Sequence, residues 1–289
     1  MENKPLISVV IGSYNRAKLL RLTIESLREE LKSLPYETII VDGGSTDGTL
    51  KWLIEQKDII TIVQHNRGKW KGKKIEHRSW GYFMNLGFKC AQGKYVCMLS
   101  DDCLIVPGAI INGYNLFKEK LGNSQKVGGI AFYWRNCPEK GKYWVGLTLG
   151  EKMFVNHGMY LKKALEDVDY IDEDSYHFYH ADGDLCLKMW QKGYCIIDSP
   201  DSYIEHYSHA DPFFRRSNAE KERSDWEKYL NKWKGVFYNE EAITGGSIKK
   251  GYIDPSDIAK KFELYHFLNF QWRVFNFGTF LMKNKKYFK

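Results

Sequence analysis

The sequence lacks an uninterrupted apolar run that could cross a bilayer. The longest apolar and aromatic stretch, Leu264 to Met282, is broken by polar or charged side chains. These are His266, Asn269, Gln271, Arg273 and Asn276. The opening residues, MENKPLISVV, also lack the apolar segment and small-residue cleavage site of a signal peptide. We therefore expect a protein of the cytoplasm.

Cysteine spacing argues against two further classes. None of the six cysteines forms a C-x-x-C pair, as a zinc knuckle or a thioredoxin-like motif would require. A chain of 289 residues can bury a core without disulfide staples. Since several of the cysteines lie inside apolar runs, we expect reduced, buried thiols. Internal repeats and low-complexity segments are also missing, so the pattern favours an ordinary globular domain.

Positive charge and aromatic residues are plentiful instead. The formal net charge is +7 and aromatic residues make up 15% of the chain. This charge suits an anionic partner, whether a nucleotide diphosphate, a phospholipid surface or a nucleic acid. A basic loop from Arg67 to Lys74 interleaves Lys69, Trp70 and Lys71 in a way that single-stranded nucleic acid could use. No recognisable nucleic-acid fold accompanies that loop, so we expect no nucleic-acid partner.

Strand and helix signals alternate over the first hundred residues. Short β-branched runs predict buried strands at 7–11, 38–41, 59–63 and 95–99. Helical periodicity predicts helices at 20–31 and 79–91, and a third that carries Leu50, Leu53 and Ile54. Such alternation predicts an α/β fold with a mostly parallel or mixed sheet and helices on both faces.

The second half is less regular. Strands are predicted at 128–134, 142–149 and 194–197, and a helix at 182–192. Trp226, Leu230 and Trp233 are spaced as one helix face. A glycine-rich change of composition at 245–251 suggests a boundary. We predict one domain over 1–240, with halves 1–105 and 106–240, and a helical, aromatic and basic appendage over 241–289.

The last segment of the appendage, 262–289, has apolar residues at spacings of three and four and ends in MKNKKYFK. It predicts a helix that packs on the domain, takes part in self-association, or lies peripherally on the inner face of a membrane.

Polar clusters follow three of the predicted strands directly. They are Gly12 to Asn15, Asp42 to Ser45, and Ser100 to Asp102. In open α/β sheets, ligands bind at the carboxyl ends of the strands. Two adjacent carboxylates at such an edge repel each other unless a cation or donors compensate. Asp101 and Asp102 thus predict either a divalent cation bound with phosphates or a solvated turn that caps a helix. Asp42 predicts either a contact to a base or ribose or a helix-capping turn.

Four segments together resemble glycosyltransferase family 2. SVVIGSYNRAKLL at 8–20, IIVDGGSTDGT at 39–49 and GKYVCMLSDDCLIVP at 93–107 are similar to its three successive signatures. HADGDLCLKMWQKGY at 180–194 is similar to its acidic motif on a helix. The resemblance covers about Leu6 to His209 and implies a GT-A-type fold.

The resemblance implies a role for each matching residue on the donor side. Gly12 and Tyr14 match the loop that packs on the nucleotide base, and Asp42 matches the carboxylate that recognises it. Asp101 and Asp102 match the acidic motif for the metal and the nucleotide, with Asp102 as the direct ligand of Mn²⁺ or Mg²⁺. His206 is expected to complete the metal site or touch the diphosphate, and Arg78 is a phosphate-contact candidate.

On the acceptor side, Asp182 matches the general base of inverting members. Asp184 matches a second acidic position that holds structure or acceptor, and His157 is expected to line the acceptor side. Two departures concern these motifs. Ala181 stands where members often have an acid, and the acidic pair is flanked by Ser100 and Cys103 rather than by a third acid.

We therefore expect an inverting, metal-dependent glycosyltransferase. It would move a sugar from a nucleotide-sugar, a UDP-sugar by resemblance, to a hydroxyl of a glycan or lipid-linked acceptor in surface polysaccharide or lipid-linked glycan synthesis. Two alternatives stay open. One is a nucleotidyltransferase of similar α/β layout, which would release pyrophosphate. The other is a non-catalytic nucleotide- or sugar-binding relative.

Overall fold

A computed structural model describes residues 4–137, 141–207, 212–240, 245–252 and 258–268, without the side chains of 212–219 and 264–268. Its main feature is a ten-stranded mixed sheet. The strands of this sheet are β1 (Ile7–Ser13), β2 (Tyr36–Asp42), β3 (Ile59–Val63), β6 (Tyr95–Ser100), β7 (Cys103–Ile105), β8 (Val127–Asn136), β9 (Tyr143–Leu147), β10 (Gly158–Leu161), β11 (Cys195–His206) and β12 (Gly246–Lys250).

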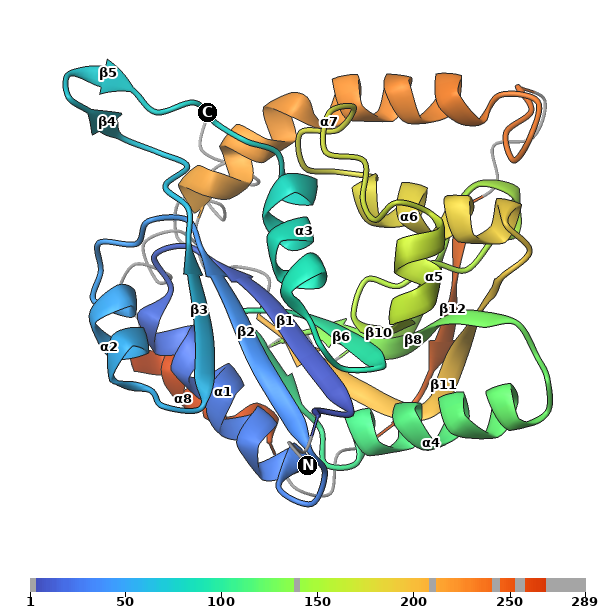
Figure 1. Cartoon of the computed structure of the whole chain (residues 1–289), viewed down its shortest axis with the longest axis horizontal. Helices are drawn as coiled ribbons and strands as arrows, with labels where there is room; N and C mark the ends of the chain where they lie inside the picture. Colours follow the sequence, from blue (N-terminus) through green and yellow to red (C-terminus); the bar gives the residue numbers. More distant parts are fainter. Residues whose placement is uncertain (1–3, 138–140, 208–211, 241–244, 253–257, 269–289) are drawn as a thin grey trace, which may run out of the picture.

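Helices cover both faces of this sheet (Figure 1). They are α1 (Ala17–Leu31), α2 (Thr49–Glu55), α3 (Trp80–Cys90), α4 (Ala109–Gly122), the 3-10 turn η1 (Leu149–Glu151), α5 (Lys162–Asp167), α6 (Ala181–Gln191), α7 (Pro212–Trp233) and α8 (Ala259–Leu268). Apolar side chains of α1, α2 and α4 form one buried cluster with one face of the sheet. Those of α3, α5, α6 and α7 form a second cluster on the opposite face, and this cluster also includes Phe262 of α8. The α/β fold with helices on both faces is confirmed.

Strand order in the sheet is β12-β9-β8-β10-β6-β1-β2-β3, and β11 pairs with β8 and β7. The β6-β1-β2-β3 part is parallel. In it, Ser13 lies beside Asp42, and Gly12 lies beside both Val41 and Ser100. The carboxyl ends of β1, β2 and β6 therefore meet at one edge, as predicted from the polar clusters that follow them.

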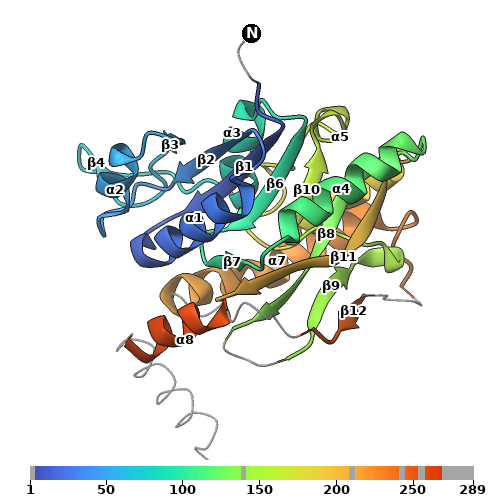
Figure 2. The same ribbon diagram turned by 90° about the horizontal axis from the view of Figure 1, so that it is seen from below.

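Antiparallel pairing brings later residues to the same edge. β10 pairs with β6 so that Gly158 lies opposite Met98, near the end of β6. The residues just before β10, Asn156 and His157, therefore lie at the carboxyl end of β6. His206, the last residue of β11, pairs with Cys103 of β7. Figure 2 shows β7 and β11 side by side, and β11 also pairs with β8 of the same sheet.

Two details differ from the expectations. Ile54 was expected on the buried face of its helix, but 73% of it is exposed, while Leu53 is buried. The helix has seven residues, so only a narrow stripe can face the sheet. The basic loop also contains a projecting two-stranded hairpin, β4 (Lys69–Trp70) and β5 (Lys73–Lys74). Its turn residues Lys71 and Gly72 have φ values of 47° and 77°, as a type I′ hairpin turn requires.

The segment after residue 240, expected to be helical, begins with a strand in the structure. β12 lies within the predicted appendage, yet it pairs with β9 and extends the main sheet. The predicted helix over 262–289 is described only as far as Leu268, where α8 ends, and its remainder lies outside the described residues. Within the part of the chain that the structure describes, none of the helices is both long enough and apolar enough to cross a membrane.

Candidate active site

Asp42 organises the loop that follows β2. Its side chain is fully buried and accepts hydrogen bonds from the Gly44 and Ser45 amides at 2.8 and 2.7 Å. The Ser45 hydroxyl donates to its second oxygen at 2.7 Å. Gly44 has a φ of +88°, and a Cβ there would lie 2.3 Å from His65 Nδ1, so only glycine fits. Asp42 therefore shapes this loop, and its predicted contact with a base would come in addition to that role.

Asn15 joins the loops after β1 and β2. Its amide donates to the Ser45 hydroxyl at 2.8 Å, and its side-chain oxygen accepts from the Thr46 amide at 2.7 Å. Asn15 has a φ of 53°, a conformation that asparagine tolerates better than most residues. The left-handed turn directs the next residue, Arg16, toward the end of β6.

Arg16 is the cation that compensates the acidic pair. Its Nη1 donates to Asp101 Oδ1 at 3.0 Å and also to Asp102 Oδ2. Both carboxylates are buried, with exposures of 5% and 3%. The sequence pattern indicated a metal ion or a solvated turn at these two acids, and this arginine was not predicted. A signal was present, because Arg16 follows the first of the three polar clusters at the same predicted edge.

Burial and the Arg16 guanidinium shift the pKa values of these two acids in opposite directions. Burial raises the pKa of the Asp101 carboxyl to about 6, against the lowering effect of Arg16. Burial also opposes ionisation of Asp102, but Arg16 and His206 outweigh it and hold the pKa of Asp102 well below its ordinary value. Asp102 is therefore a carboxylate throughout the neutral range, which is the state that a metal ligand requires.

His206 and His157 form an imidazole corner beside Asp102. His206 Nε2 lies at an ion-pair distance of 3.2 Å from Asp102 Oδ1, and the two imidazole rings are 5.0 Å apart. Cys103 Sγ lies 3.8 Å from His157 Nδ1. His157 was expected to line the acceptor side, but it is 1% exposed and belongs to this corner instead. Burial and His206 lower its pKa to about 3, so its ring is neutral.

The corner fits a divalent cation. Within the described residues, Asp102 Oδ1 and His206 Nδ1 are buried without an aligned hydrogen-bond partner. Donor atoms of Cys103, His157 and His206 lie within 4.8 Å of one another. Buried polar atoms are normally satisfied, so these two atoms are available as ligands. Carboxylate and imidazole together suit Mn²⁺ better than Mg²⁺, which prefers an all-oxygen shell.

Asp182 lies in the first turn of α6. Its Oδ1 accepts from the Gly183 amide at 2.8 Å, and Asn156 Nδ2 donates to its Oδ2 at 3.3 Å. Burial raises the pKa of Asp182 despite the Gly183 hydrogen bond. Since Asn156 and His157 are consecutive, Asp182 and the acidic pair are held by the same short segment. Asp182 is thus a partly exposed carboxylate of increased basicity.

Residues distant in sequence hold the start of α6. Asp225 of α7 is 1% exposed and accepts from the amides of residues 177, 178 and 179 at 2.9 to 3.0 Å. His180 then adopts a φ of 66° with its ring stacked 5.3 Å from Tyr229. Backbone strain of this kind needs a surrounding structure that enforces it, and α7 supplies that structure here. Asp225 was not singled out from the sequence, because nothing local marks it.

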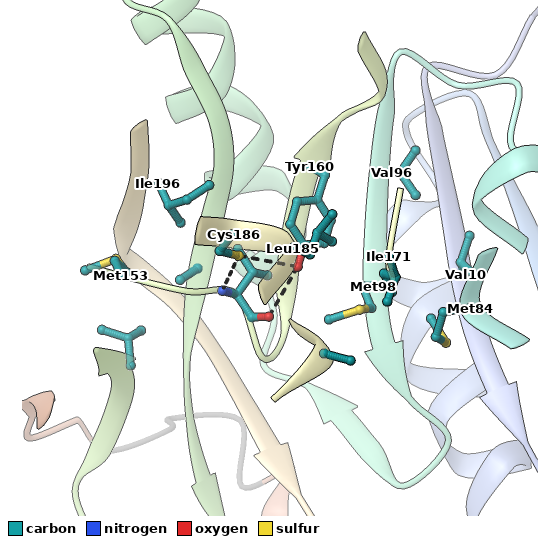
Figure 3. Packing of buried hydrophobic residues seen from close by; sticks show 14 of the residues in the cluster. Val10, Met84, Val96, Met98, Met153, Tyr160, Ile171, Leu185, Cys186 and Ile196 are labelled. Carbon is teal, nitrogen blue, oxygen red and sulfur yellow. Dashed lines mark hydrogen bonds between the residues drawn. The ribbon is translucent and has the colours of Figure 1, made fainter. Parts of the chain in front are cut away.

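The inner face of α6 is fixed by packing (Figure 3). Cys186 Sγ accepts from the Val155 amide at 3.4 Å, and the Tyr160 hydroxyl lies 3.9 Å from the same sulfur. Tyr160 also donates to the Val155 carbonyl at 3.3 Å. These contacts tie the helix that carries Asp182 to the segment that carries Asn156.

Asp184 is a structural anchor between α6 and α7. It is fully buried and accepts from Lys232 Nζ at 2.9 Å, Trp233 Nε1 at 2.9 Å and the Tyr176 hydroxyl at 3.0 Å. Both of its oxygens are therefore occupied. Asp184 was expected either to stabilise the fold or to contact the acceptor, and these hydrogen bonds favour the first role.

We predict that Asp184→Ala lowers the free energy of unfolding by about 3 kcal/mol. The substitution leaves the Trp233 and Tyr176 donors buried without this acceptor and removes one of the two carboxylate partners of Lys232, which keeps Asp172 at 2.9 Å. Urea denaturation would measure the loss, with Glu166→Ala on the exposed face of α5 as the control. A loss no larger than that of the control would show that the anchor is dispensable.

The remaining predicted donor-side residues lie at the same edge. Tyr14 packs against Gly43, where a Cβ would come within 3.1 Å of its ring. The Arg67 guanidinium lies 5.6 Å from the Tyr14 ring centre, so the first residue of the basic loop accompanies the predicted base-packing residue. Arg78 is half-exposed and paired with Glu76 at 2.8 Å. The backbone of Arg78 is pinned by Asn66, whose Oδ1 accepts from the Arg78 amide at 2.6 Å.

Comparison with known proteins supports the resemblance seen in the sequence. The profile described as Glycosyl transferase family 2 matches residues 8–129. Chondroitin synthase of Pasteurella multocida (strain Pm70) is 22% identical over 265 residues, which covers 75% of this chain and 26% of that protein. Poly(ribitol-phosphate) beta-N-acetylglucosaminyltransferase TarP of Staphylococcus aureus (strain N315) is 26% identical over 195 residues, which covers 66% of this chain and 50% of that protein. The chain thus spans from about a quarter to half the length of these relatives.

Solved structures show the same fold. Mannosyltransferase PcManGT from Pyrobaculum calidifontis, in complex with GDP-Man and Mn²⁺, superposes with a TM-score of 0.56 at 18% identity. The alignment covers 80% of this chain and 65% of that one. TarS 1-349 of S. aureus in complex with UDP-GlcNAc gives 0.55 at 18% identity, covering 78% and 66%. Residues 8–129 of this chain are thus a glycosyltransferase family 2 segment, set in a GT-A-type fold.

Proposed function

We propose that the protein transfers a sugar from a nucleotide-sugar, in the first instance a UDP-sugar, to a hydroxyl of a glycan or lipid-linked acceptor. The transfer would proceed with inversion at the anomeric carbon and serve the synthesis of a surface polysaccharide or lipid-linked glycan. The observation that carries the proposal is the corner at the carboxyl ends of the strands, where Asp102 Oδ1 lies 3.2 Å from His206 Nε2 and, within the described residues, His206 Nδ1 is buried without a hydrogen-bond partner. Structural neighbours bind UDP-GlcNAc and GDP-Man, and one of them holds Mn²⁺.

The donor side needs to stabilise negative charge. Expulsion of a nucleoside diphosphate places charge on its oxygens, and groups already in position stabilise it best. Asp102 and His206 would hold Mn²⁺ or Mg²⁺, which supplies Lewis acidity to the diphosphate when bound. Arg16 keeps Asp102 ionised and in place. Tyr14, with Arg67 against its ring, and the loop held by Asp42 would receive the nucleoside.

On the acceptor side, the proton of a hydroxyl must be removed. A hydroxyl is a weak nucleophile, so a carboxylate within reach should accept its proton as the new bond to the anomeric carbon forms. Asp182 suits this step because burial raises its pKa and Asn156 and Gly183 hold its orientation. A single base that acts opposite the leaving diphosphate produces inversion.

A panel of nucleotide sugars tests the proposal. We expect slow release of UDP from one UDP-sugar that requires Mn²⁺ or Mg²⁺ and stops when EDTA is added. Asp102→Ala should abolish the metal-dependent part of donor binding, measured by calorimetry with and without Mn²⁺. Unchanged donor affinity in this variant would remove Asp102 from the metal site.

The product of the same assay separates the alternatives. Release of pyrophosphate would indicate a nucleotidyltransferase. Binding of the nucleotide sugar without any turnover, with or without acceptor, would indicate a non-catalytic relative. Only a nucleoside diphosphate product supports the proposed transferase.

A further inference from the structure

A basic pocket lies beside the metal corner, between strands β8, β9 and β12. Its volume is about 580 Å³, within the range of small-molecule sites. It is lined by Arg135, Asn136, Gly141, Lys142, Trp144, Gly246, Ser247 and Lys249. None of these lining residues is acidic. None of them was predicted from the sequence as a site residue.

Strand register places most of these side chains on one face of the sheet. Trp144 pairs with Lys249 and with Trp134, and directly paired residues point to the same face. Asn136 lies two residues beyond Trp134, so it shares that face. In parallel pairing His206 lies beside Asn136. A continuous row therefore runs from the metal-corner histidine across β8 and β9 to Lys249.

Ring contacts confirm that the row is packed. The Trp134 and Trp144 rings are 4.0 Å apart, and Trp134 lies 5.3 Å from the His206 ring. Trp144, which lines the pocket, is thus separated from His206 by a single aromatic ring. A ligand in the pocket would lie close to the metal corner.

The charge of the pocket comes from its two lysines. Arg135 is already neutralised, because its Nη2 lies 2.7 Å from the fully buried Glu205. Lys142 and Lys249 are exposed, and neither makes an ion pair within the described part of the chain. Two free ammonium groups facing one cavity attract an anion.

The other lining groups suit a sugar. Within the described residues, Asn136 Oδ1 is buried and has no hydrogen-bond donor, so it can accept from a hydroxyl. The partly exposed Trp144 indole offers a flat apolar surface, on which the C–H face of a pyranose can pack. Ser247 adds a hydroxyl at the rim. Uncharged sugars would satisfy these groups but would leave the two lysines without a partner.

We propose that this pocket is an acceptor subsite for a glycan that carries carboxylate or phosphate groups. The sugar packs on Trp144 and donates to Asn136, while Lys142 and Lys249 bind the anionic group. This inference rests on the proposed function, because the pocket is assigned to the acceptor through its position beside the metal corner.

Binding of defined glycans tests the subsite. The probes are an oligosaccharide that alternates glucuronate with N-acetylhexosamine, a ribitol-phosphate oligomer, and an uncharged N-acetylhexosamine oligosaccharide. We expect calorimetry on the full chain to detect at least one anionic probe, with an affinity that falls as salt is raised, and to find the uncharged probe much weaker. The two anionic probes distinguish a carboxylate from a phosphate acceptor.

The double variant Lys142→Ala/Lys249→Ala should weaken binding of the anionic probe roughly tenfold. The control double variant Lys57→Ala/Lys118→Ala removes the same charge from two exposed positions, one in the loop after α2 and one on α4. It should bind the anionic probe as tightly as the wild type does. Trp144→Phe should weaken binding less than the lysine pair does. Equal binding by both double variants, equal binding of the uncharged probe, or no anionic binding by the wild type would each overturn the subsite.

Acceptor-independent release of nucleoside diphosphate is the independent readout. It should be unchanged in both double variants, because neither alters the donor side. If the wild type releases no nucleoside diphosphate, the proposed function is contradicted. Glycan binding to the pocket can still be measured in that case, so the two failures are distinguishable.

Discussion

An Asp182→Asn variant is expected to lose glycosyl transfer by about 10³-fold while binding the donor with unchanged affinity. Asparagine has the shape of aspartate and can still accept from the Gly183 amide, but it cannot take a proton from the acceptor hydroxyl. Initial rates of transfer and donor calorimetry, both with Mn²⁺, would measure the two effects separately. The pH profile gives a second readout. Burial raises the pKa of Asp182. As the pH is lowered, wild-type activity should therefore be lost at a higher pH than the one at which an exposed aspartate is protonated.

The matched control is Asp174→Asn, the same substitution at an exposed position in the loop before α6. It should retain wild-type transfer and wild-type stability. If Asp182→Asn transfers sugar at the wild-type rate, the base lies elsewhere and the inverting mechanism loses its main support. If donor affinity falls along with the rate, Asp182 contributes to the donor site instead.

The sequence predicted the parallel half of the sheet well because its strands are short, buried and β-branched. The strand at 59–63 has the predicted bounds, and Ser79 caps α3 through a hydrogen bond from the Tyr82 amide. The three polar clusters were predicted to share one edge, and the strands that precede them do end at one edge of the sheet. Short elements were missed. β7 has three residues and β10 has four, which is too few to show a period.

Site residues were predictable where they lie in local motifs and not where they act across long separations. Asp42 and Asp102 were singled out from their places after strands and Asp182 from its resemblance to a family motif at a helix start, and their roles stay predictions. Arg16 was missed because its partners lie 85 and 86 positions away, and a basic residue in a polar loop resembles a solvated one. Asp225 was missed for the same reason. His157 was expected to line the acceptor side, and its buried ring lies beside Cys103 and His206, because sequence position alone does not reveal which face of a strand end a side chain reaches.

The acidic motif therefore depends on a partner that the motif does not contain. Arg16 donates to both carboxylates, and both are almost completely buried. Its own side chain is 25% exposed, so the cluster lies just beneath the surface of the ligand-binding edge. Without the guanidinium, two adjacent negative charges would remain in a site of low polarity, where removal of one partner of a buried pair is costly.

An Arg16→Met variant is accordingly expected to lose about 3–5 kcal/mol of folding free energy at neutral pH in EDTA. The loss should shrink as the pH is lowered through 6 toward 4. Arg16 lowers the pKa of both acids, so its removal raises their folded-state pKa values. The folded variant then holds protons that its unfolded chain releases, and its stability relative to the wild type rises as pH falls. Urea denaturation of the variant and the wild type at about pH 7.5 and about pH 5 would measure how the difference in their unfolding free energies changes with pH.

Arg28→Met on the same helix provides the control. Arg28 pairs with Asp58 at 2.6 Å, but both side chains are largely exposed to solvent, so its loss should cost at most about 1 kcal/mol. Arg16→Lys, which keeps the charge but not the forked geometry, should fall between wild type and Arg16→Met. An Arg16→Met variant that is as stable in EDTA as Arg28→Met at both pH values would show that this arginine is not needed to compensate Asp101 and Asp102.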